Sequence, residues 1–188
     1  IKNINWYHGD ILKFDSFDQE YDAIESSGVL HHTGDPKKGF KILTNKLKKG
    51  GFFKLGLYSR IFRDQLKPAK NFIQEYSDGT KSLASQVRMV RKKIIDLKGL
   101  SPKKFPLILR DFYSTSEFID LLMHAQEIDY TIDELIELFK EDYNFLGFVF
   151  SGSKEKLNYR LQFPNDIKML NLNNWKNYEQ NEQNLFST

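Results

Sequence analysis

The sequence predicts an α/β fold in which a parallel sheet is interrupted by a helical insertion and closed by an antiparallel hairpin. Strand-like and helical patterns alternate over residues 1–58, which indicates crossover connections between parallel strands. Residues 59–130 carry helical patterns without a convincing strand. Residues 131–188 begin with a helical pattern and continue into two strand-like runs. We therefore divide the chain into an α/β core, an insertion or substrate cap, and the closing elements of the same core.

Three strands and one helix are expected in the first segment. Asp35 and Pro36 form a typical helix start, because aspartate caps free N–H groups and proline suits the first helical position. The Gly50-Gly51 pair is expected to end that helix. The strand-like runs are residues 3–8, 21–27 and 52–58.

Two Ser/Thr-x-x-Glu patterns mark further helix starts. Ser114 with Glu117 and Thr131 with Glu134 each place a hydroxyl and a carboxylate at the spacing of a capping box. Between residues 83 and 94, apolar side chains recur at helical spacing opposite arginine and lysine. The insertion is therefore expected to consist of amphipathic helices.

The closing segment is expected to add a β-hairpin and a surface tail. The runs NFLGFVF (144–150) and LNYRLQF (157–163) are separated by Ser-Gly-Ser, which is typical of an antiparallel hairpin. The tail from Asn173 is rich in asparagine and glutamine and is expected to lie on the surface.

The composition is that of a soluble globular protein, and we expect a cytoplasmic location. Hydrophobic residues make up 40% of the chain and charged residues 28%. The absence of cysteine excludes a disulfide framework, a thiolate metal site and a cysteine nucleophile, and it fits the cytoplasm. No apolar run approaches the roughly 20 residues that span a bilayer, and no signal-peptide pattern opens the chain. The net charge of +3 does not by itself indicate nucleic acid.

Polar or glycine-containing sequences stand at the expected carboxyl ends of the strands. In parallel α/β sheets, ligands bind at these ends. Here they are Gly9-Asp10, residues 26–32 and residues 58–60. The sequence therefore predicts that a ligand site lies at this edge of the sheet.

Several stretches resemble the second half of class I S-adenosylmethionine-dependent methyltransferases. They are GDIL (9–12), YDAIESSGVLHH (21–32), LKKGGFFKLGLYS (47–59) and TIDELIELFKEDYNFLGF (131–148). Residues 56–59, 111–127 and 163–179 resemble more specifically a bacterial group in which this domain often follows tetratricopeptide repeats. The resemblance implies a partial Rossmann-like methyltransferase sheet, S-adenosyl-L-methionine as cofactor, and a small molecule or protein side chain as methyl acceptor.

The glycine-rich loop of that family has no counterpart in this sequence. No GxGxG occurs in the 188 residues, and the acidic residue that holds the cofactor ribose is missing as well. We expect residue 1 to lie near the third strand of the family fold, with the first half of the domain and any tetratricopeptide repeats upstream. The fragment alone is then expected to bind cofactor poorly and to be inactive.

The resemblance implies cofactor-binding roles at the strand ends. The Asp10 carboxylate would accept a hydrogen bond from the adenine amino group, and the Ile11 N–H would reach a ring nitrogen. The alternative interpretation of Asp10 is a turn aspartate that satisfies its own backbone. The alternative for residues 26–28 is a tight turn from strand to loop without a ligand. The expected cofactor-binding residues are Asp10, Ile11, Ser26, Ser27, Gly28 and His32.

The adjacent histidines His31 and His32 do not predict a metal site. Neighbouring residues point to different sides, and no third ligand stands at zinc-type spacing. One imidazole is instead expected to fix the loop beneath the cofactor. A role as general base stays open, because imidazole titrates near neutral pH.

Asp120, His124 and Glu127 are the candidate catalytic residues. At 100° per residue they lie within about 60° of one another on one helix face. That face either is solvated or covers the active site, in which case His124 would be a general base oriented by Asp120 or Glu127. The candidate substrate-binding residues are Tyr58, Arg60, Asp111 and Tyr113. Arg60 would suit an anionic group of the substrate. The alternative interpretation is that these residues anchor loops or lie solvated on the surface.

A non-catalytic interaction module derived from the methyltransferase fold is the alternative function. RNA binding is disfavoured, although residues 37–49 and 88–104 are basic. Both stretches have the pattern of amphipathic helices with lysine on the wet face, and no basic patch interleaved with aromatic residues accompanies them.

Overall fold

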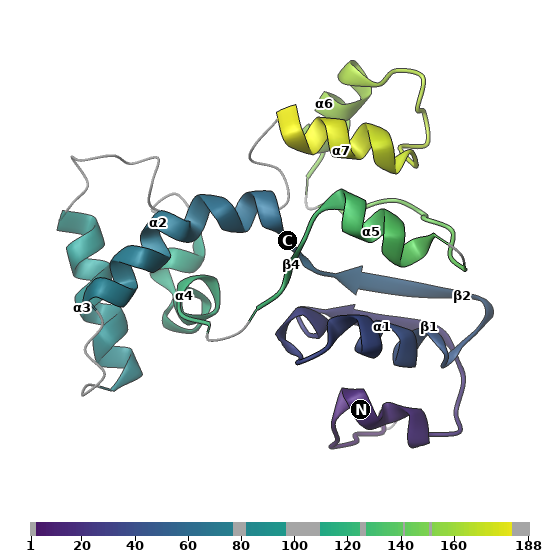
Figure 1. The fold of residues 1–188 in the computed structure, drawn as a ribbon, viewed down its shortest axis with the longest axis horizontal. Coiled ribbons are helices and arrows are strands. Elements are labelled where there is room, and N and C mark those ends of the chain that lie inside the picture. Colours follow the sequence, from purple (N-terminus) through teal and green to yellow (C-terminus); the bar gives the residue numbers. More distant parts are fainter. Residues whose placement is uncertain are drawn as a thin grey trace. The chain divides into compact units, whose positions relative to one another are not determined.

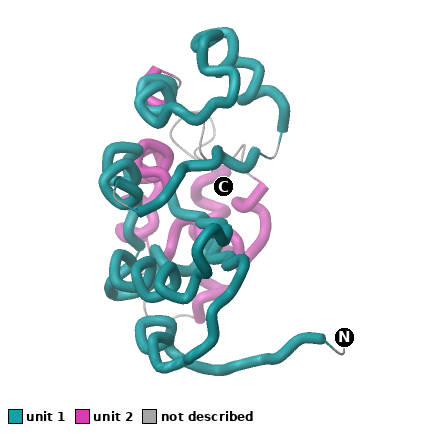
Figure 2. The backbone as a smooth tube through the Cα atoms, turned by 90° about the vertical axis from the view of Figure 1, so that its right-hand side faces the viewer, with its two compact units in different colours: residues 1–58, 126–178, 188 teal, residues 59–125, 179–187 magenta. Residues whose placement is uncertain are grey.

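The computed structural model describes residues 3–76, 82–96, 110–124, 127–140, 142–150 and 152–181 (Figure 1). The chain divides into two compact units (Figure 2). Unit 1 comprises residues 1–58, 126–178 and 188, and unit 2 comprises residues 59–125 and 179–187. Unit 1 is therefore built from separate stretches of chain, between which the residues of unit 2 intervene.

Unit 1 contains helices and short strands in mixed order. Its elements are η1 (Ile11–Ser16), β1 (Tyr21–Ser27), η2 (Leu30–His32), α1 (Pro36–Thr44), β2 (Leu47–Gly56), β4 (Asp129–Tyr130), α5 (Ile132–Phe139) and α6 (Lys154–Gln162). Two further elements, β3 (Tyr58–Ser59) and α7 (Leu172–Asn181), cross the boundary between the units in the chain. The α/β class predicted from the sequence is confirmed at this coarse level.

The parallel connection between β1 and β2 is confirmed. Ile24 pairs with Phe53 and Ser26 with Leu55 in a parallel register, and α1 forms the crossover between the strands (Figure 1). A second two-stranded sheet pairs β3 with β4. Within the described residues these are the sheets present, so the larger Rossmann-like sheet stays a prediction.

The helix α1 starts where the sequence predicts and ends earlier. Asp35 is the N-cap, and its carboxylate accepts a hydrogen bond from the N–H of Lys38 at 2.9 Å. The expected stop at Gly50-Gly51 is wrong, because α1 ends at Thr44 and both glycines lie in β2. The strand takes these residues because the Tyr21 N–H donates to the Lys46 carbonyl at 2.8 Å, which starts the pairing with β1.

The two faces of the β1–β2 pair differ in burial. On one face, Ile24, Phe53 and Leu55 pack with the buried side chains of Leu30, Phe40 and Leu43. On the other face, Phe52 is 62% exposed. The expected strand over residues 3–8 is wrong, since this segment has no strand pairing among the described residues.

The predicted antiparallel hairpin is wrong. Residues 154–162 form the helix α6, and residues 142–150 form no strand. The alternating pattern misleads because Tyr159 is fully buried, whereas Leu157 and Leu161 on either side are exposed. The Tyr159 ring stacks on Trp175 with ring centroids 3.8 Å apart. A helix can bury this one side chain while the leucines two residues before and after it stay exposed.

The expected surface tail is also wrong. Residues 172–181 form α7, in which Trp175 and Tyr178 are fully buried despite the asparagine-rich surroundings. The indole Nε1–H of Trp175 donates to the Met169 carbonyl at 2.8 Å, which satisfies its buried donor. These aromatic residues, spaced three apart, face Tyr159 of α6 and give the C-terminal part of unit 1 a small core of its own.

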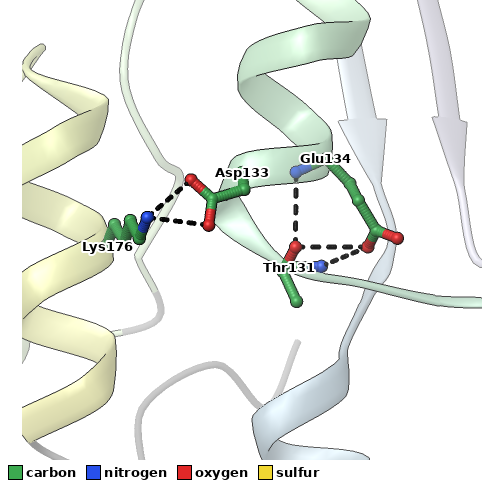
Figure 3. A network of polar contacts seen from close by, with 4 residues as sticks. All are labelled: Thr131, Asp133, Glu134 and Lys176. Carbon is green, nitrogen blue, oxygen red and sulfur yellow. Dashed lines mark hydrogen bonds and ion pairs between the residues drawn. The ribbon is translucent and has the colours of Figure 1, made fainter.

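The capping box at the start of α5 is confirmed (Figure 3). The Glu134 N–H donates to Thr131 Oγ1 at 3.3 Å, and the Thr131 N–H donates to Glu134 Oε2 at 2.9 Å. In the same turn, Asp133 pairs with Lys176 of α7 at 2.8 Å. The turn thus both starts α5 and ties it to the C-terminal helix.

Unit 2 is helical, as the sequence predicts. Its elements are α2 (Arg60–Tyr76), α3 (Leu83–Asp96), η4 (Arg110–Tyr113) and α4 (Thr115–Leu122). Ser114 caps α4, and its Oγ accepts from the Glu117 N–H at 3.4 Å. The buried core residues are Leu66, Ala69, Ile73, Val87, Val90, Ile94, Phe112, Phe118, Leu121 and Leu122. In the part of the chain that the structure describes, none of the helices has both the length and the apolar character needed to cross a membrane.

Candidate functional site at the carboxyl end of the parallel strands

The carboxyl end of β1 is a turn built from small residues. Gly28 has a φ of +69°, a left-handed conformation that favours glycine over residues with a Cβ. In the neighbouring strand, a Cβ built on Gly56 would lie 3.0 Å from Ser27 Cα. Glycine at both positions therefore lets the chain turn sharply and lets the two strand ends approach closely.

The serine hydroxyls of this turn face different surroundings. Ser26 is 3% exposed, and its Oγ has no hydrogen-bond partner among the described residues. Ser27 lies on the exposed face, where its Oγ donates to Glu25 Oε1 at 3.2 Å. Glu25 in turn pairs with Lys54 at 2.6 Å, and this hydrogen bond lowers the pKa of the Glu25 carboxyl. Because buried hydroxyls are usually hydrogen-bonded, Ser26 offers a polar group suited to a ligand.

The two histidines lie in the short helix η2, which follows the turn. His31 is 1% exposed, and its ring centroid lies 3.9 Å from that of Tyr58 and 4.2 Å from that of His32. The His31 carbonyl accepts from the Ile128 N–H at 2.9 Å. His32 is half-buried and meets the Tyr58 ring edge-on, with centroids 5.7 Å apart. The structure thus brings both imidazoles and the phenol into one aromatic group beside the strand ends.

Asp10 opens the turn η1. Its Oδ1 accepts from the Leu12 N–H at 2.9 Å, and Lys13 Nζ lies 4.0 Å from its Oδ2. Ile11 and Phe14 of η1 pack against the core of unit 1. A carboxylate has about four lone-pair positions, so the capping bond leaves Asp10 able to accept from a further donor.

The candidate catalytic residues divide between the units. The expected helix face over residues 120–127 is wrong, because α4 ends at Leu122 and neither His124 nor Glu127 is helical. In unit 2, His124 Nε2 nevertheless lies 3.3 Å from Asp120 Oδ1, and both side chains are partly exposed. Glu127 belongs to the residues of unit 1. The geometry of unit 2 therefore pairs His124 with Asp120.

The candidate substrate-binding residues divide in the same way. Tyr58 belongs to unit 1, and Arg60 is half-buried at the start of α2 in unit 2. Asp111 and Tyr113 share the turn η4, where Tyr113 is largely exposed and its ring meets that of Phe112 edge-on at 5.2 Å.

Three side-chain hydrogen bonds could not be predicted from the sequence. Ser59 Oγ donates to Glu179 Oε1 at 2.6 Å, and burial raises the pKa of this glutamate. Lys46 Nζ donates to the carbonyls of Asp15 and Phe17. Their partners lie 120, 31 and 29 residues away in the chain, so no local pattern reveals these pairs.

Comparison with known proteins does not assign a family. No protein-family profile matches the sequence. An uncharacterized protein of Synechococcus is 28% identical over 141 residues, which cover 69% of this chain and 32% of that protein. The chain thus spans about a third of the length of this curated relative.

Proposed function

We propose that this chain is the C-terminal part of a methyltransferase domain that transfers a methyl group from S-adenosyl-L-methionine to a small molecule or protein side chain. The observation that carries the proposal is the β1–α1–β2 unit. Its strand β1, parallel to β2, ends in a small-residue turn with a left-handed Gly28 and a buried Ser26 hydroxyl that has no partner among the described residues. In open α/β sheets this edge is where ligands bind.

In this proposal the start of η1 and the carboxyl end of β1 hold the cofactor. Asp10 accepts from the adenine amino group, Ile11 donates its N–H to a ring nitrogen, and the turn 26–28 approaches the ligand through backbone and hydroxyl groups. His32 forms a wall of the pocket. Bound S-adenosyl-L-methionine would supply an electrophilic methyl group, and the chain's own contribution is mainly to position the acceptor in line with it.

His124 is the proposed general base, with Asp120 as its positioning partner. When Nε2 carries the proton, it donates to the Asp120 carboxylate at 3.3 Å, and Nδ1 is left as the acceptor for the proton of the methyl acceptor. Substituting His124 by glutamine should lower the rate of methyl transfer and leave cofactor affinity unchanged. Tyr58, Arg60, Asp111 and Tyr113 are proposed to contact the acceptor.

The cofactor site is tested by calorimetric titration of S-adenosylhomocysteine into the full-length protein that contains this chain. Ser27→Leu places a bulky side chain at the strand end, and Ala23→Leu is the matched control, because Ala23 lies on the same exposed face of β1. We expect Ser27→Leu to weaken binding by at least about tenfold, because the added side chain would occupy space that the ligand needs beside the turn. Binding to Ala23→Leu should match the wild type.

Two results would contradict the proposal. If the wild-type full-length protein binds neither S-adenosylmethionine nor S-adenosylhomocysteine, the enzymatic function fails, and the non-catalytic interaction module is favoured. If the wild type binds but Ser27→Leu and Ala23→Leu are equally impaired, the cofactor does not bind at the carboxyl end of β1.

A further inference from the structure

Lys46 connects three segments of unit 1. Its backbone N–H donates to the Leu43 carbonyl at 3.0 Å, at the end of α1, and its carbonyl accepts from the Tyr21 N–H at 2.8 Å, at the start of β1. Its side-chain Nζ donates to the carbonyls of Asp15, at 3.0 Å, and of Phe17. The ammonium group therefore binds the C-terminal end of η1, while the backbone fixes Lys46 to the helix and the sheet.

The turn η1 packs against α1 and the core of unit 1 through side chains that are only partly buried. None of its six residues is fully buried. Ile11 and Phe14 contribute partly buried side chains to the core, and the Phe14 ring stacks on Phe17 with centroids 4.6 Å apart. A 3₁₀ turn also has poorer hydrogen-bond geometry than an α-helix. The placement of this turn should therefore depend on the contact made by Lys46 together with this partly buried packing.

The charge of Lys46 suits its place. Carbonyl groups at the C-terminal end of a helical turn carry partial negative charge and attract cations. Asp10 accepts the Leu12 N–H at the opposite end of the same turn. The turn is thus fixed by an anion at its start and a cation at its end.

We propose that Lys46 is a positioning residue that holds Asp10 and Ile11 in register for the adenine ring and so sets selectivity for its amino group. This inference rests on the proposed cofactor site. Lys46 itself touches no ligand in this scheme, because its ammonium group is engaged by the Asp15 and Phe17 carbonyls. Its effect is transmitted through η1 to the two residues at the start of the turn.

The test compares two ligands that differ at one position of the base. In S-inosylhomocysteine, a carbonyl oxygen replaces the amino group of S-adenosylhomocysteine, so Asp10 loses its donor and faces an acceptor. We expect the wild-type full-length protein to prefer the adenosyl ligand by more than about tenfold. In Lys46→Met this preference should fall to within about threefold. Lys46→Arg retains a cation with several donors and should restore most of the preference.

Lys41→Met is the matched control, since Lys41 is an exposed lysine in the last turn of α1. Its ligand preference should equal that of the wild type. Hydrogen exchange provides a readout without ligand: the Lys13 and Phe17 amides, which donate within η1, should exchange faster in Lys46→Met than in Lys41→Met.

The outcomes separate this inference from the function on which it rests. If the wild type binds neither ligand, both the cofactor site and the role of Lys46 fail. If the wild type prefers the adenosyl ligand and Lys46→Met keeps the same preference, the role of Lys46 alone is overturned. A uniform loss of affinity for both ligands in Lys46→Met, with the preference intact, would likewise overturn it, because that result indicates a general structural role.

Discussion

The helical core of unit 2 and the β1–β2 layer of unit 1 are held together in different ways. In unit 2, ten buried side chains from α2, α3, η4 and α4 form one apolar cluster. The core cluster beside the β1–β2 layer has three buried side chains, Leu30 of η2 and Phe40 and Leu43 of α1, surrounded by partly buried ones. Parallel strands are usually covered on both faces, yet here Phe52 is exposed on one face. The comparison teaches that apolar packing dominates in unit 2, whereas close backbone approach and polar contacts hold the candidate site.

The largest effect is expected from truncating the core of unit 2. Phe118 is fully buried, its ring meets Phe112 at 5.4 Å, and the Arg91 guanidinium lies 5.2 Å from its centroid. Phe118→Ala should lower the free energy of unfolding by about 3–5 kcal/mol in urea titrations. Leu83→Ala, at an exposed position of α3, should cost less than about 1 kcal/mol. Equal losses in the two variants would contradict the idea of a core dominated by apolar packing.

Backbone approach in the β1–β2 layer is tested at its glycines. A Cβ at Gly51 would lie 2.9 Å from the Asp22 carbonyl oxygen of the neighbouring strand, so backbone must shift to accept it. Gly51→Ala should lower the free energy of unfolding by about 1–3 kcal/mol. Gly34→Ala is the control, because nothing lies within 4 Å of the Cβ it would add. Thermal unfolding of the two variants should separate them clearly, and identical curves would show that the strands can move apart freely.

Polar capping in unit 1 should contribute a smaller amount. Thr131→Ala removes the hydroxyl that accepts the Glu134 N–H and should cost about 0.5–2 kcal/mol of unfolding free energy. Thr115→Ala changes the same residue type just inside α4, where Ser114 supplies the cap. Chemical denaturation should detect a loss in the first variant and little change in the second. A larger loss of stability in Thr115→Ala than in Thr131→Ala would contradict the idea that the Thr131 cap is a main contact of α5.

The smallest effect is expected from the buried carboxyl of unit 2. Burial raises the pKa of Glu179, so the folded protein keeps its proton at pH values where the unfolded chain has released it. The free energy of unfolding should therefore fall as the pH rises from the ordinary glutamate pKa through the raised one. Glu179→Gln keeps an acceptor for Ser59 Oγ without a charge, so its stability relative to the wild type should increase across that window.

Urea unfolding from about pH 4 to pH 7 measures this difference, since the ordinary glutamate pKa is about 4.3. Glu75→Gln, at an exposed carboxylate of α2, is the control and should show no such trend. A pH-independent difference between Glu179→Gln and the wild type would contradict the assignment.

Local patterns predicted the elements whose signals are local. The strand 21–27, the Asp35 cap of α1 and the Thr131 capping box depend on neighbouring residues, and all three were predicted correctly. The start of β2 at Leu47 was missed because its cause is the distant Tyr21 N–H. The alternation of 157–163 predicted a strand because Tyr159 is apolar enough to fit that pattern, although its partner is Trp175 in another helix.

The candidate site shows the same division. The Ser-Ser-Gly turn at the end of β1 was predicted from small residues after a strand. Its aromatic neighbour could not be derived from sequence, because the contact of His31 with Tyr58 joins residues 27 positions apart through the β1–α1–β2 crossover. The role inferred for Lys46 depends on the backbone carbonyls of Asp15 and Phe17. Every residue has a backbone carbonyl, so no sequence motif could predict this contact.

The burial of Trp175 gives the molecule two spectroscopically distinct indoles. The chain has two tryptophans, of which Trp6 is 88% exposed and Trp175 is fully buried. Iodide should therefore quench the emission of Trp6, while Trp175 emits at shorter wavelength and is protected as long as α6 and α7 stay packed. In a Trp6→Phe background, intrinsic fluorescence becomes a single-site probe of the C-terminal helices, and their unfolding can be followed separately from that of the rest of the chain.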